Sequence, residues 1–380
     1  MTYNSASNGR LCSVAALLLG LSCFTAAQTP SDLPKGPGKV IVHPKFGGGI
    51  LGFDIDQNGS EGVLAEAQLL SNGKVLSAVE TFDQKTGKII KLVAKTETQD
   101  DDVTFGVVGT SVGLIEHEHV GSNGFVDKRI YHVLSPLNSN KYTSLWTPSF
   151  DADHIITGVS RNQGSPTNAF FVYDNTLNNP HNFLLASNVA QNTFGPRVVL
   201  NVPQWGYGTP LAFDTKTNQA VVAQDYGSPT DQPIVGIIDL TKARVATFTG
   251  VGFGFVNGIA VDSEDGIFCT TTEIDSNVQF YHLKTKTGFT ELLAESEGQL
   301  NSGADVEFDP IHKLFLIAQP ISTAGGSSIQ VYDTKGNLVE SLNGFNFSNA
   351  SSVIPVHIAL NPAHRSGFVD DPAGIRSFTY

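Results

Sequence analysis

The pattern of apolar and polar positions along the chain is that of a β protein. Short segments in which apolar and polar residues alternate are bounded by Gly, Asn, Asp and Ser. Patterns with the 3.6-residue period of an amphipathic helix are scarce. Alternation with a period of two places every second side chain on the same face of a strand, as in half-buried strands joined by tight turns. The pattern therefore predicts an all-β fold.

The predicted strands recur as a repeating unit. In each unit a strand ends in Asp or Asn, a short turn follows, and an apolar second strand ends in a polar residue. The clearest copies of this pair of strands are residues 210–225, 257–273, 305–319 and 357–371. A third and a fourth strand usually complete the unit, as in residues 329–333 and 336–342. The spacing of roughly 45–50 residues is the period expected for the blades of a β-propeller.

The copies predict seven blades, or six if the irregular second unit is an insertion. The last unit, from His357 to Tyr380, holds only three strands, and the early strand at residues 49–56 has no unit of its own. We expect this N-terminal strand to pair with the C-terminal blade and close the ring, because closure removes exposed sheet edges. Residues 61–70 could form a helix capped by Ser60, but alignment with the other units favours a strand.

Two segments resemble a known group of propellers. Asn257–Phe268 is similar to the strand–turn–strand core of NHL-repeat and SMP-30 (gluconolactonase)-like β-propellers, and Ile329–Val339 resembles the second half of such a blade. The likeness covers two or three blades and implies the fold. For the gluconolactonase-like enzymes it also implies that Asn257 ligates a divalent metal ion that polarises a lactone carbonyl. The Glu-Gly-Pro opening that supplies the first carboxylate of those enzymes is missing, although Asp305 or His357 could provide other ligands. The alternative is that Asn257 is a turn residue before a strand.

The N-terminal residues have the features of a cleaved signal peptide. Arg10 is the only charge before the apolar segment Val14–Leu21, and small residues follow as far as Ala27. We predict a signal peptide at residues 1–27, an N-terminal extension at 28–44 and a single propeller domain at 45–380. A lipoprotein anchored through Cys23 is the alternative, but the residues before this cysteine fit that pattern poorly. No later apolar segment approaches the ~18 residues of a membrane helix, so we expect a secreted or periplasmic protein without membrane insertion.

Charge and cysteine content narrow the range of partners. The formal net charge is −13 at pH 7, which argues against nucleic acid and anionic membrane surfaces as partners. Cys12 and Cys23 lie in the predicted signal peptide and leave Cys269 alone, so we expect no internal disulfide. We expect a monomer.

The alignment of the second strands predicts where a site would lie. Each of these strands carries a polar residue near the same end, where loops gather at one mouth of the channel. These residues are Glu80, Glu118 or His119, Arg161, Asp225, Glu273, Gln319 and Asp370. A ring of carboxylates with one arginine could hold a polar ligand or a divalent cation. The alternative is that strand ends are polar because they meet water.

Two shorter patterns are candidates for other chemistry. In Glu116–His119 the alternation places both histidines on one face of a strand, which suits a metal or, with Glu118, acid–base catalysis. His119, Glu118 and Arg161 are therefore the candidate catalytic residues, and a solvated strand is the alternative. Asp54, Asp56 and Asn58 match the first half of a calcium loop, although the closing acid is missing from its usual position. An Asn-Gly hairpin turn would explain the same residues without a metal.

Two functions of different kinds are consistent with these patterns. The first is a non-catalytic secreted propeller that binds a protein, a glycan or a small molecule at one mouth of its channel. The second is an extracellular metal-dependent hydrolase or lactonase of the gluconolactonase-like kind, with a divalent cation such as Ca²⁺ held by Asn257, Asp305 and His357. We favour the first, because the full ligand set of the enzymes cannot be assembled from the sequence.

Overall fold

The computed structural model describes residues 34–57 and 59–98, and beyond them the strands given below with parts of their connections, up to residue 380. For the strands between residues 99 and 210, and for some later positions, it describes the backbone and not the side chains. The predicted signal peptide lies outside the described residues.

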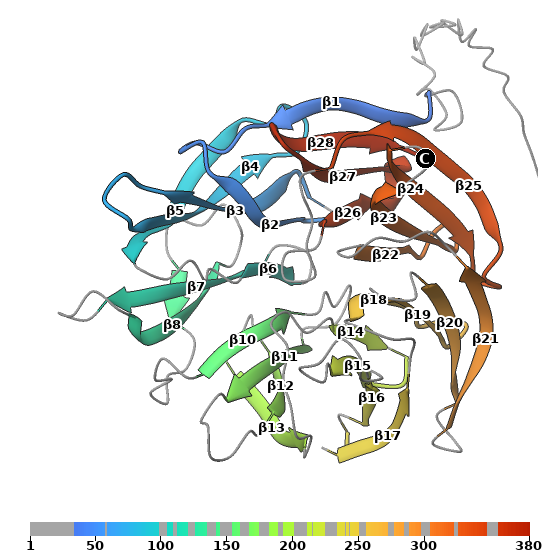
Figure 1. The fold of residues 1–380 in the computed structure, drawn as a ribbon. Coiled ribbons are helices and arrows are strands. Elements are labelled where there is room, and N and C mark those ends of the chain that lie inside the picture. Colours follow the sequence, from blue (N-terminus) through green and yellow to red (C-terminus); the bar gives the residue numbers. More distant parts are fainter. Residues whose placement is uncertain are drawn as a thin grey trace, which may run out of the picture. The chain divides into compact units, whose positions relative to one another are not determined.

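The described strands form seven antiparallel sheets of four strands each (Figure 1). The first sheet contains β2 (Gly49–Ile55), β3 (Glu61–Leu69), β4 (Val75–Asp83) and β5 (Ile89–Thr98). The second contains β6 (Phe105–Val108), β7 (Val112–Val120), β8 (Val126–Leu134) and β9 (Tyr142–Ser144). The third contains β10 (His154–Val159), β11 (Thr167–Asp174), β12 (Asn182–Asn188) and β13 (Thr193–Leu200).

The later sheets repeat the same up-and-down order. The fourth contains β14 (Leu211–Asp214), β15 (Gln219–Gln224), β16 (Ile234–Asp239) and β17 (Arg244–Gly250). The fifth contains β18 (Val256–Asp262), β19 (Ile267–Thr272), β20 (Asn277–Lys284) and β21 (Phe289–Glu297). The sixth contains β22 (Asp305–Asp309), β23 (Leu314–Ser322), β24 (Gly326–Asp333) and β25 (Leu338–Phe345). The C-terminal sheet contains β26 (Ile358–Asn361), β27 (Ser366–Asp371), β28 (Gly374–Thr379) and β1 (Gly36–Val42).

Consecutive sheets contact one another through their first strands. This succession of contacts runs from β14 through β18, β22, β26 and β2 to β6. The first strand of each sheet is therefore the innermost, and the sheets are arranged as the blades of a propeller. The predicted all-β propeller arrangement is confirmed, whereas the number of blades and the closure of the whole ring remain predictions.

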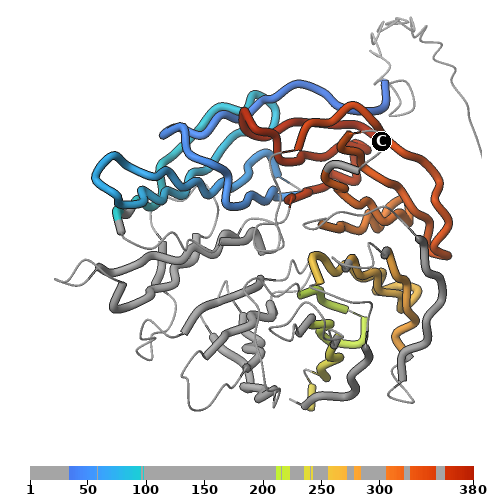
Figure 2. Tube along the Cα trace, in the orientation of Figure 1, coloured from blue at the N-terminus to red at the C-terminus, as the bar shows by residue number. Residues whose placement is uncertain are grey.

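An N-terminal strand completes the three-stranded C-terminal unit, but a different one from the strand predicted. β1 pairs with β28, with Gly36 opposite Thr379 and Val42 opposite Ile375 (Figure 2). The segment 49–56, which we expected in this place, forms β2 and pairs with β3. A hairpin with the following strand closes a loop of only a few residues, which is the pairing of lowest entropic cost. The predicted extension at residues 28–44 thus contains β1, and residues 61–69 form a strand as the alignment favoured.

The aspartates that end the first strands hold the turns that follow. Oδ1 of Asp214 accepts a hydrogen bond from Lys216 N at 3.0 Å, and Oδ1 of Asp309 accepts one from Ile311 N at 2.8 Å. These turns also share a left-handed residue four positions after the strand end: Asn218 (φ 55°), Gly266 (φ 66°), Lys313 (φ 57°) and Arg365 (φ 46°). The repeated Asp of the sequence pattern is therefore a turn cap, because its side chain bonds to backbone two or three residues on, whereas Asn361 makes no such side-chain hydrogen bond.

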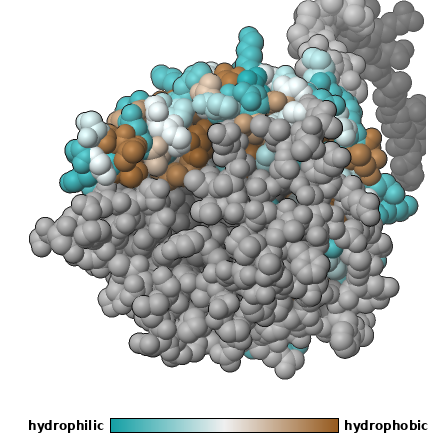
Figure 3. Space-filling model, in the orientation of Figure 1, coloured by the Kyte–Doolittle hydropathy of each residue, from teal (hydrophilic) through white to brown (hydrophobic). Residues whose placement is uncertain are grey.

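The apolar faces of neighbouring sheets pack against each other. Phe53, Leu64 and Phe82 of the first sheet meet Phe368 and Ile375 of the C-terminal sheet in one buried cluster. The described part of the surface mixes hydrophilic and hydrophobic residues (Figure 3). No helix of the described residues is long and apolar enough to cross a membrane.

Candidate functional site

Three of the candidate metal ligands lie at the beginnings of innermost strands in adjacent sheets. Asp305 is the first residue of β22, His357 directly precedes β26, and Asn257 is the second residue of β18. The register of β18 with β19 shifts between Val256 and Gly258, so that Asn257 is the extra residue of a bulge. Bulges commonly re-aim a side chain at a site. The three residues therefore lie at neighbouring inner strands, and their role as metal ligands remains a prediction.

The carboxylate of Asp305 lies between β18 and β26. Its Oδ2 accepts a hydrogen bond from Ile358 N at 3.3 Å, and its Oδ1 accepts one from Val306 N at 2.8 Å. A Cβ atom at Gly258 would lie 3.1 Å from Asp305 Oδ1 and 2.8 Å from Val306 N. Glycine at position 258 therefore allows the two inner strands to approach around this carboxylate.

His357 and Asp370 form a pair across β26 and β27. Asp370 Oδ2 accepts a hydrogen bond from His357 N at 2.9 Å and lies 3.1 Å from His357 Nδ1. Asp370 Oδ1 is buried without a hydrogen-bond partner among the described residues. The imidazole also contacts the ring of Phe53 on β2, with 6.4 Å between the ring centroids. The pair thus fixes the orientation of the imidazole and leaves Nε2 as the ring atom that could meet a ligand.

The pKa values of Asp305 and His357 are both raised above the ordinary values of these side chains. Burial, and after it the charge of Glu307, raises the pKa of Asp305 to about 7, although His357 and the N–H donors of Ile358 and Val306 oppose this shift. Burial disfavours the charged form of His357, but the hydrogen bond to Asp370 and the charges of Asp370 and Asp305 raise its pKa overall. Near neutral pH the site therefore holds a carboxyl group, Asp305, that can donate or accept a proton, and the contact with Asp370 favours the protonated form of the neighbouring His357 imidazole.

Asn257 is the residue that most clearly indicates a ligand. Its side chain is only 6% exposed, and both Oδ1 and Nδ2 lack a hydrogen-bond partner among the described residues. A buried polar group without a partner costs about 1–3 kcal/mol, and such groups are few in native proteins. A ligand that both donates to Oδ1 and accepts from Nδ2 would remove this cost.

The structure places some of the other residues of the predicted ring on second strands, one on a third strand, and leaves the rest undescribed. Gln319 and Asp370 lie on the second strands β23 and β27 as expected, and both are buried. Glu80 was expected on a second strand but lies on β4, the third strand of the first sheet, because that sheet begins with β2. Glu118 and His119 lie on the second strand β7, where side chains are not described. Arg161, Asp225 and Glu273 lie outside the described residues.

The predicted calcium loop is a β-hairpin. Asp54 lies inside β2 opposite Val63, and Asp56 follows directly after that strand. Asp54 Oδ1 accepts a hydrogen bond from Ile55 N at 2.7 Å. Asn58 lies outside the described residues, so a calcium ion at this hairpin remains a prediction. Among the residues that the structure describes, no group of three His, Cys, Asp or Glu side chains could hold a metal ion.

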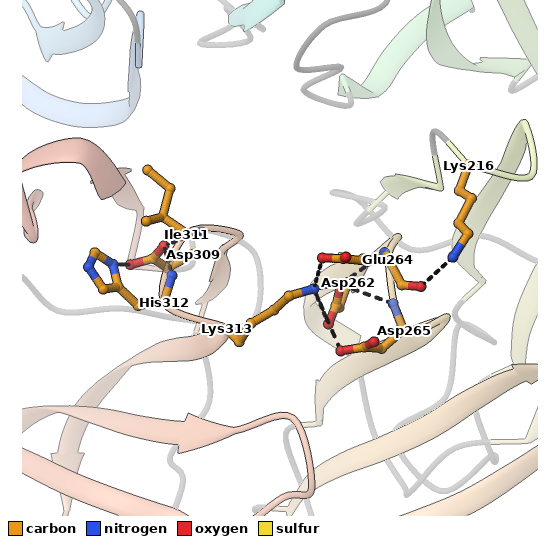
Figure 4. A network of polar contacts seen from close by, with 8 residues as sticks. All are labelled: Lys216, Asp262, Glu264, Asp265, Asp309, Ile311, His312 and Lys313. Carbon is orange, nitrogen blue, oxygen red and sulfur yellow. Dashed lines mark hydrogen bonds and ion pairs between the residues drawn. The ribbon is translucent and has the colours of Figure 1, made fainter.

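The opposite ends of the inner strands carry an ionic network between neighbouring turns (Figure 4). Lys313 Nζ lies 3.0 Å from Asp262 Oδ1, 2.6 Å from Glu264 Oε2 and 3.6 Å from Asp265 Oδ2. Lys216 Nζ donates to the carbonyl oxygen of Glu264 at 2.6 Å. Burial lowers the pKa of Lys313, but the hydrogen bonds to Glu264 and Asp262 and the nearby carboxylate charges outweigh it and raise this pKa. Because its cation is already paired with three carboxylates, this network joins sheets and does not resemble a binding site.

The sequence pattern missed one pair of polar residues. Glu66 on β3 and Glu80 on β4 are both 0% exposed and lie on the same face of the first sheet. Glu66 is flanked by Ala65 and Ala67, and this alternation alone would place it on the solvent face of a strand.

No family model matches the chain, and no match was found among curated proteins. The resemblance to NHL-repeat and gluconolactonase-like propellers remains a prediction.

Proposed function

We propose that the chain is a secreted, seven-bladed β-propeller that binds a protein, a glycan or a small molecule at the mouth where the inner strands begin. The seven four-stranded sheets support the blade number. The contacts of β6 with β2 and with β10, and of β13 with β17, support a ring that continues through the second, third and fourth sheets. The pairing of β1 with β28 supports closure, because it joins the two ends of the array. Export rests on the leader-like pattern of residues 1–27.

The buried amide of Asn257, which has no hydrogen-bond partner in the described part of the chain, carries the proposal. Inward-facing polar groups without partners are expected where a ligand completes the hydrogen bonding. Asp305 and His357 lie on the next inner strands and add a carboxyl group and an imidazole at the same mouth. These groups donate and accept hydrogen bonds at neutral pH, which suits a polar ligand without a strong charge.

An extracellular metal-dependent hydrolase is the second candidate, and one observation favours it. Asp370 contacts His357 Nδ1, and a carboxylate on that nitrogen is the usual partner of a histidine whose Nε2 binds a metal. Asn257 Oδ1 and the Asp305 carboxylate are oxygen donors from adjacent strands. A divalent ion would act as a Lewis acid on a carbonyl group when bound. Since the described residues contain no assembled group of three ligands, this candidate needs a further ligand, such as Glu118 or Glu273, from elsewhere.

The two candidates are separated by one set of measurements on the purified full-length protein. Glycan and peptide arrays would be probed first, and thermal shifts would be recorded with sugar monomers and with Ca²⁺, Mg²⁺, Mn²⁺ and Zn²⁺ salts. We expect binding of an array component without added metal. Metal found by elemental analysis, together with turnover of lactone or ester substrates, would instead support the hydrolase.

Variants connect any binding to the mouth. Asn257→Ala and Asp305→Asn should weaken binding of the array component by tenfold or more. The matched control is Asn343→Ala, which changes an exposed asparagine on the outermost strand β25 and should leave binding unchanged. Binding that survives both mouth variants would place the ligand elsewhere and overturn the proposal.

A further inference from the structure

Two buried carboxylates lie side by side on the first sheet. Glu66 on β3 is opposite Ala78 on β4, and Leu64 is opposite Glu80, so that the two glutamates are diagonal neighbours on one face. Both side chains are 0% exposed. The same face carries Leu64 and Phe82, which pack against the C-terminal sheet.

The connection between β1 and β2, residues 43–48, covers this pair. Its backbone turns three N–H groups towards the carboxylates. Phe46 N donates to Glu66 Oε1 at 3.0 Å, Gly48 N donates to Glu66 Oε2 at 3.0 Å, and Lys45 N donates to Glu80 Oε2 at 3.4 Å. Glu80 Oε1 is buried without a hydrogen-bond partner among the described residues. The connection is therefore held mainly by its hydrogen bonds to Glu66. Glu80 accepts too few hydrogen bonds to stabilise a negative charge well.

Little positive charge balances the two glutamates. The ammonium groups of Lys45 and Lys95 lie over the ring of Phe46, 5.6 and 5.1 Å from its centroid, and Lys95 pairs with Glu97 at 3.6 Å. His43 Nδ1 contacts Ala373 O at 2.8 Å.

From the C-terminal sheet, Ala359, Phe368 and Ile375 pack in the same apolar cluster as Leu64 and Phe82. His357, which is paired with Asp370, contacts Phe53 opposite Leu64. No described lysine, arginine or histidine forms an ion pair with either glutamate. Two neighbouring buried carboxylates repel each other when both are ionised, which favours a proton on one of them while the site is closed. Burial, and after it the charge of Glu66, raises the pKa of Glu80 to about 7, while the N–H group and charge of Lys45 oppose this shift.

We propose that residues 43–48 form a proton-dependent clasp, which is held closed while Glu80 is neutral and loosens when Glu80 and Glu66 are both ionised. Loss of the Glu80 proton to solvent leaves two anions beneath three N–H donors. Their repulsion is relieved when water enters and the connection lifts from the sheet. The clasp lies between β1 and β2, so it regulates how firmly the strand that completes the C-terminal sheet is joined to the first sheet.

Hydrogen–deuterium exchange of the full-length protein tests the clasp. Exchange of peptides containing residues 45–48 would be measured between pH 5.5 and 8.5 and corrected for the intrinsic pH dependence of amide exchange. We expect their protection to fall on the order of tenfold across this range, since one unit of pKa shift corresponds to a tenfold change in the opening equilibrium. Peptides from β24, which does not contact the clasp, provide the internal reference.

Two variants and one control complete the test. Glu80→Gln cannot ionise and should keep the 45–48 amides protected at pH 8.5. Glu66→Gln removes the second carboxylate and with it the repulsion, so the loss of protection with rising pH should be absent; this variant serves if the first one folds poorly. Glu264→Gln changes an exposed glutamate and should behave as the unmodified protein. Protection that does not change with pH, or that falls equally in Glu80→Gln, would overturn the clasp.

Discussion

The hydroxyl group of Tyr380 donates a hydrogen bond to Asp309 Oδ2 at 2.7 Å. Asp309 ends the first strand of the sixth sheet and is 0% exposed, whereas Tyr380 follows β28 of the C-terminal sheet and is 2% exposed. Burial, and then the charge of Asp309, raises the pKa of the Tyr380 hydroxyl. One side-chain contact thus connects two neighbouring blades at the end opposite to the candidate site.

Tyr380→Phe should lower the free energy of unfolding by about 1–3 kcal/mol, because a buried carboxylate oxygen loses a charge-assisted hydrogen bond. Equilibrium denaturation in urea measures this change. Tyr332→Phe is the control, since the Tyr332 hydroxyl donates to the neutral amide of Gln330 at 2.8 Å and its loss should have a smaller effect. Equal effects of the two variants would show that the charge of Asp309 is unimportant.

Lys313→Met should destabilise the protein by about 2 kcal/mol, because Asp262 is 1% exposed and would lose its paired cation. The same denaturation experiment applies. Lys35→Met is the matched control, since Lys35 pairs with Glu340 at 2.6 Å with half of its side chain exposed, and such surface pairs contribute about 0–1 kcal/mol. A change in Lys313→Met no larger than in this control would contradict the role given to the network.

Asn257→Leu should stabilise the ligand-free protein by about 1 kcal/mol, since it replaces a buried amide, which forms no hydrogen bond with the described residues, by an apolar group of similar volume. The same variant should abolish binding at the mouth. The melting temperature measured with and without the array component separates the two effects. Asn343→Leu, at an exposed position, should leave stability nearly unchanged, and a marked loss of stability in Asn257→Leu would mean that its amide is satisfied.

The protein should be more stable at mildly acidic than at alkaline pH. The pKa of Glu80 is about 7 in the folded chain, against 4.5 for an ordinary glutamate, so the folded state binds the proton more tightly. Its contribution is complete below pH 4.5, is lost as the pH rises to 7, and is absent above that. We expect a loss on the order of 2 kcal/mol, measured by denaturation at several pH values.

Glu80→Gln should remove the part of this pH dependence that belongs to Glu80. The free energy of unfolding of this variant should still fall with rising pH, but less steeply. The reason is that the pKa of Asp305 is also raised to about 7, so its protonated form stabilises the fold in the same way. An unchanged pH profile in Glu80→Gln would exclude Glu80 as the titrating group.

The sequence predicted the strands better than their partners. The repeated Asp or Asn at strand ends identified the turns of the later sheets, and Asp214, Asp262 and Asp309 cap these turns through local hydrogen bonds. The pairing of β1 with β28 is not local, and the alternation of residues 36–42 alone does not select a partner. Because residues 49–56 were expected in the C-terminal sheet, the strands of the first sheet were counted from β3. Glu80 was therefore expected on the second strand of that sheet, whereas it lies on the third.

The candidate site was predicted in part. The positions of Asn257, Asp305 and His357 at the starts of inner strands followed from the repeat, because equivalent residues of a repeat occupy equivalent places. The bulge at Asn257 and the contact of Asp370 with His357 depend on register and could not be inferred from spacing. The Glu66–Glu80 pair required the pairing of β3 with β4 to be known.

The β1–β28 pairing also has a consequence for biosynthesis. Arg376 Nη1 donates to Gly38 O at 2.7 Å across 338 residues of sequence. Contacts between residues so far apart in the sequence form slowly, because the chain loses conformational entropy before these contacts can stabilise the fold. During synthesis β1 emerges first and must wait for the last strand, with its edge unpaired and open to aggregation. A chaperone that shields residues 36–42 would therefore be expected to act until translation is nearly complete.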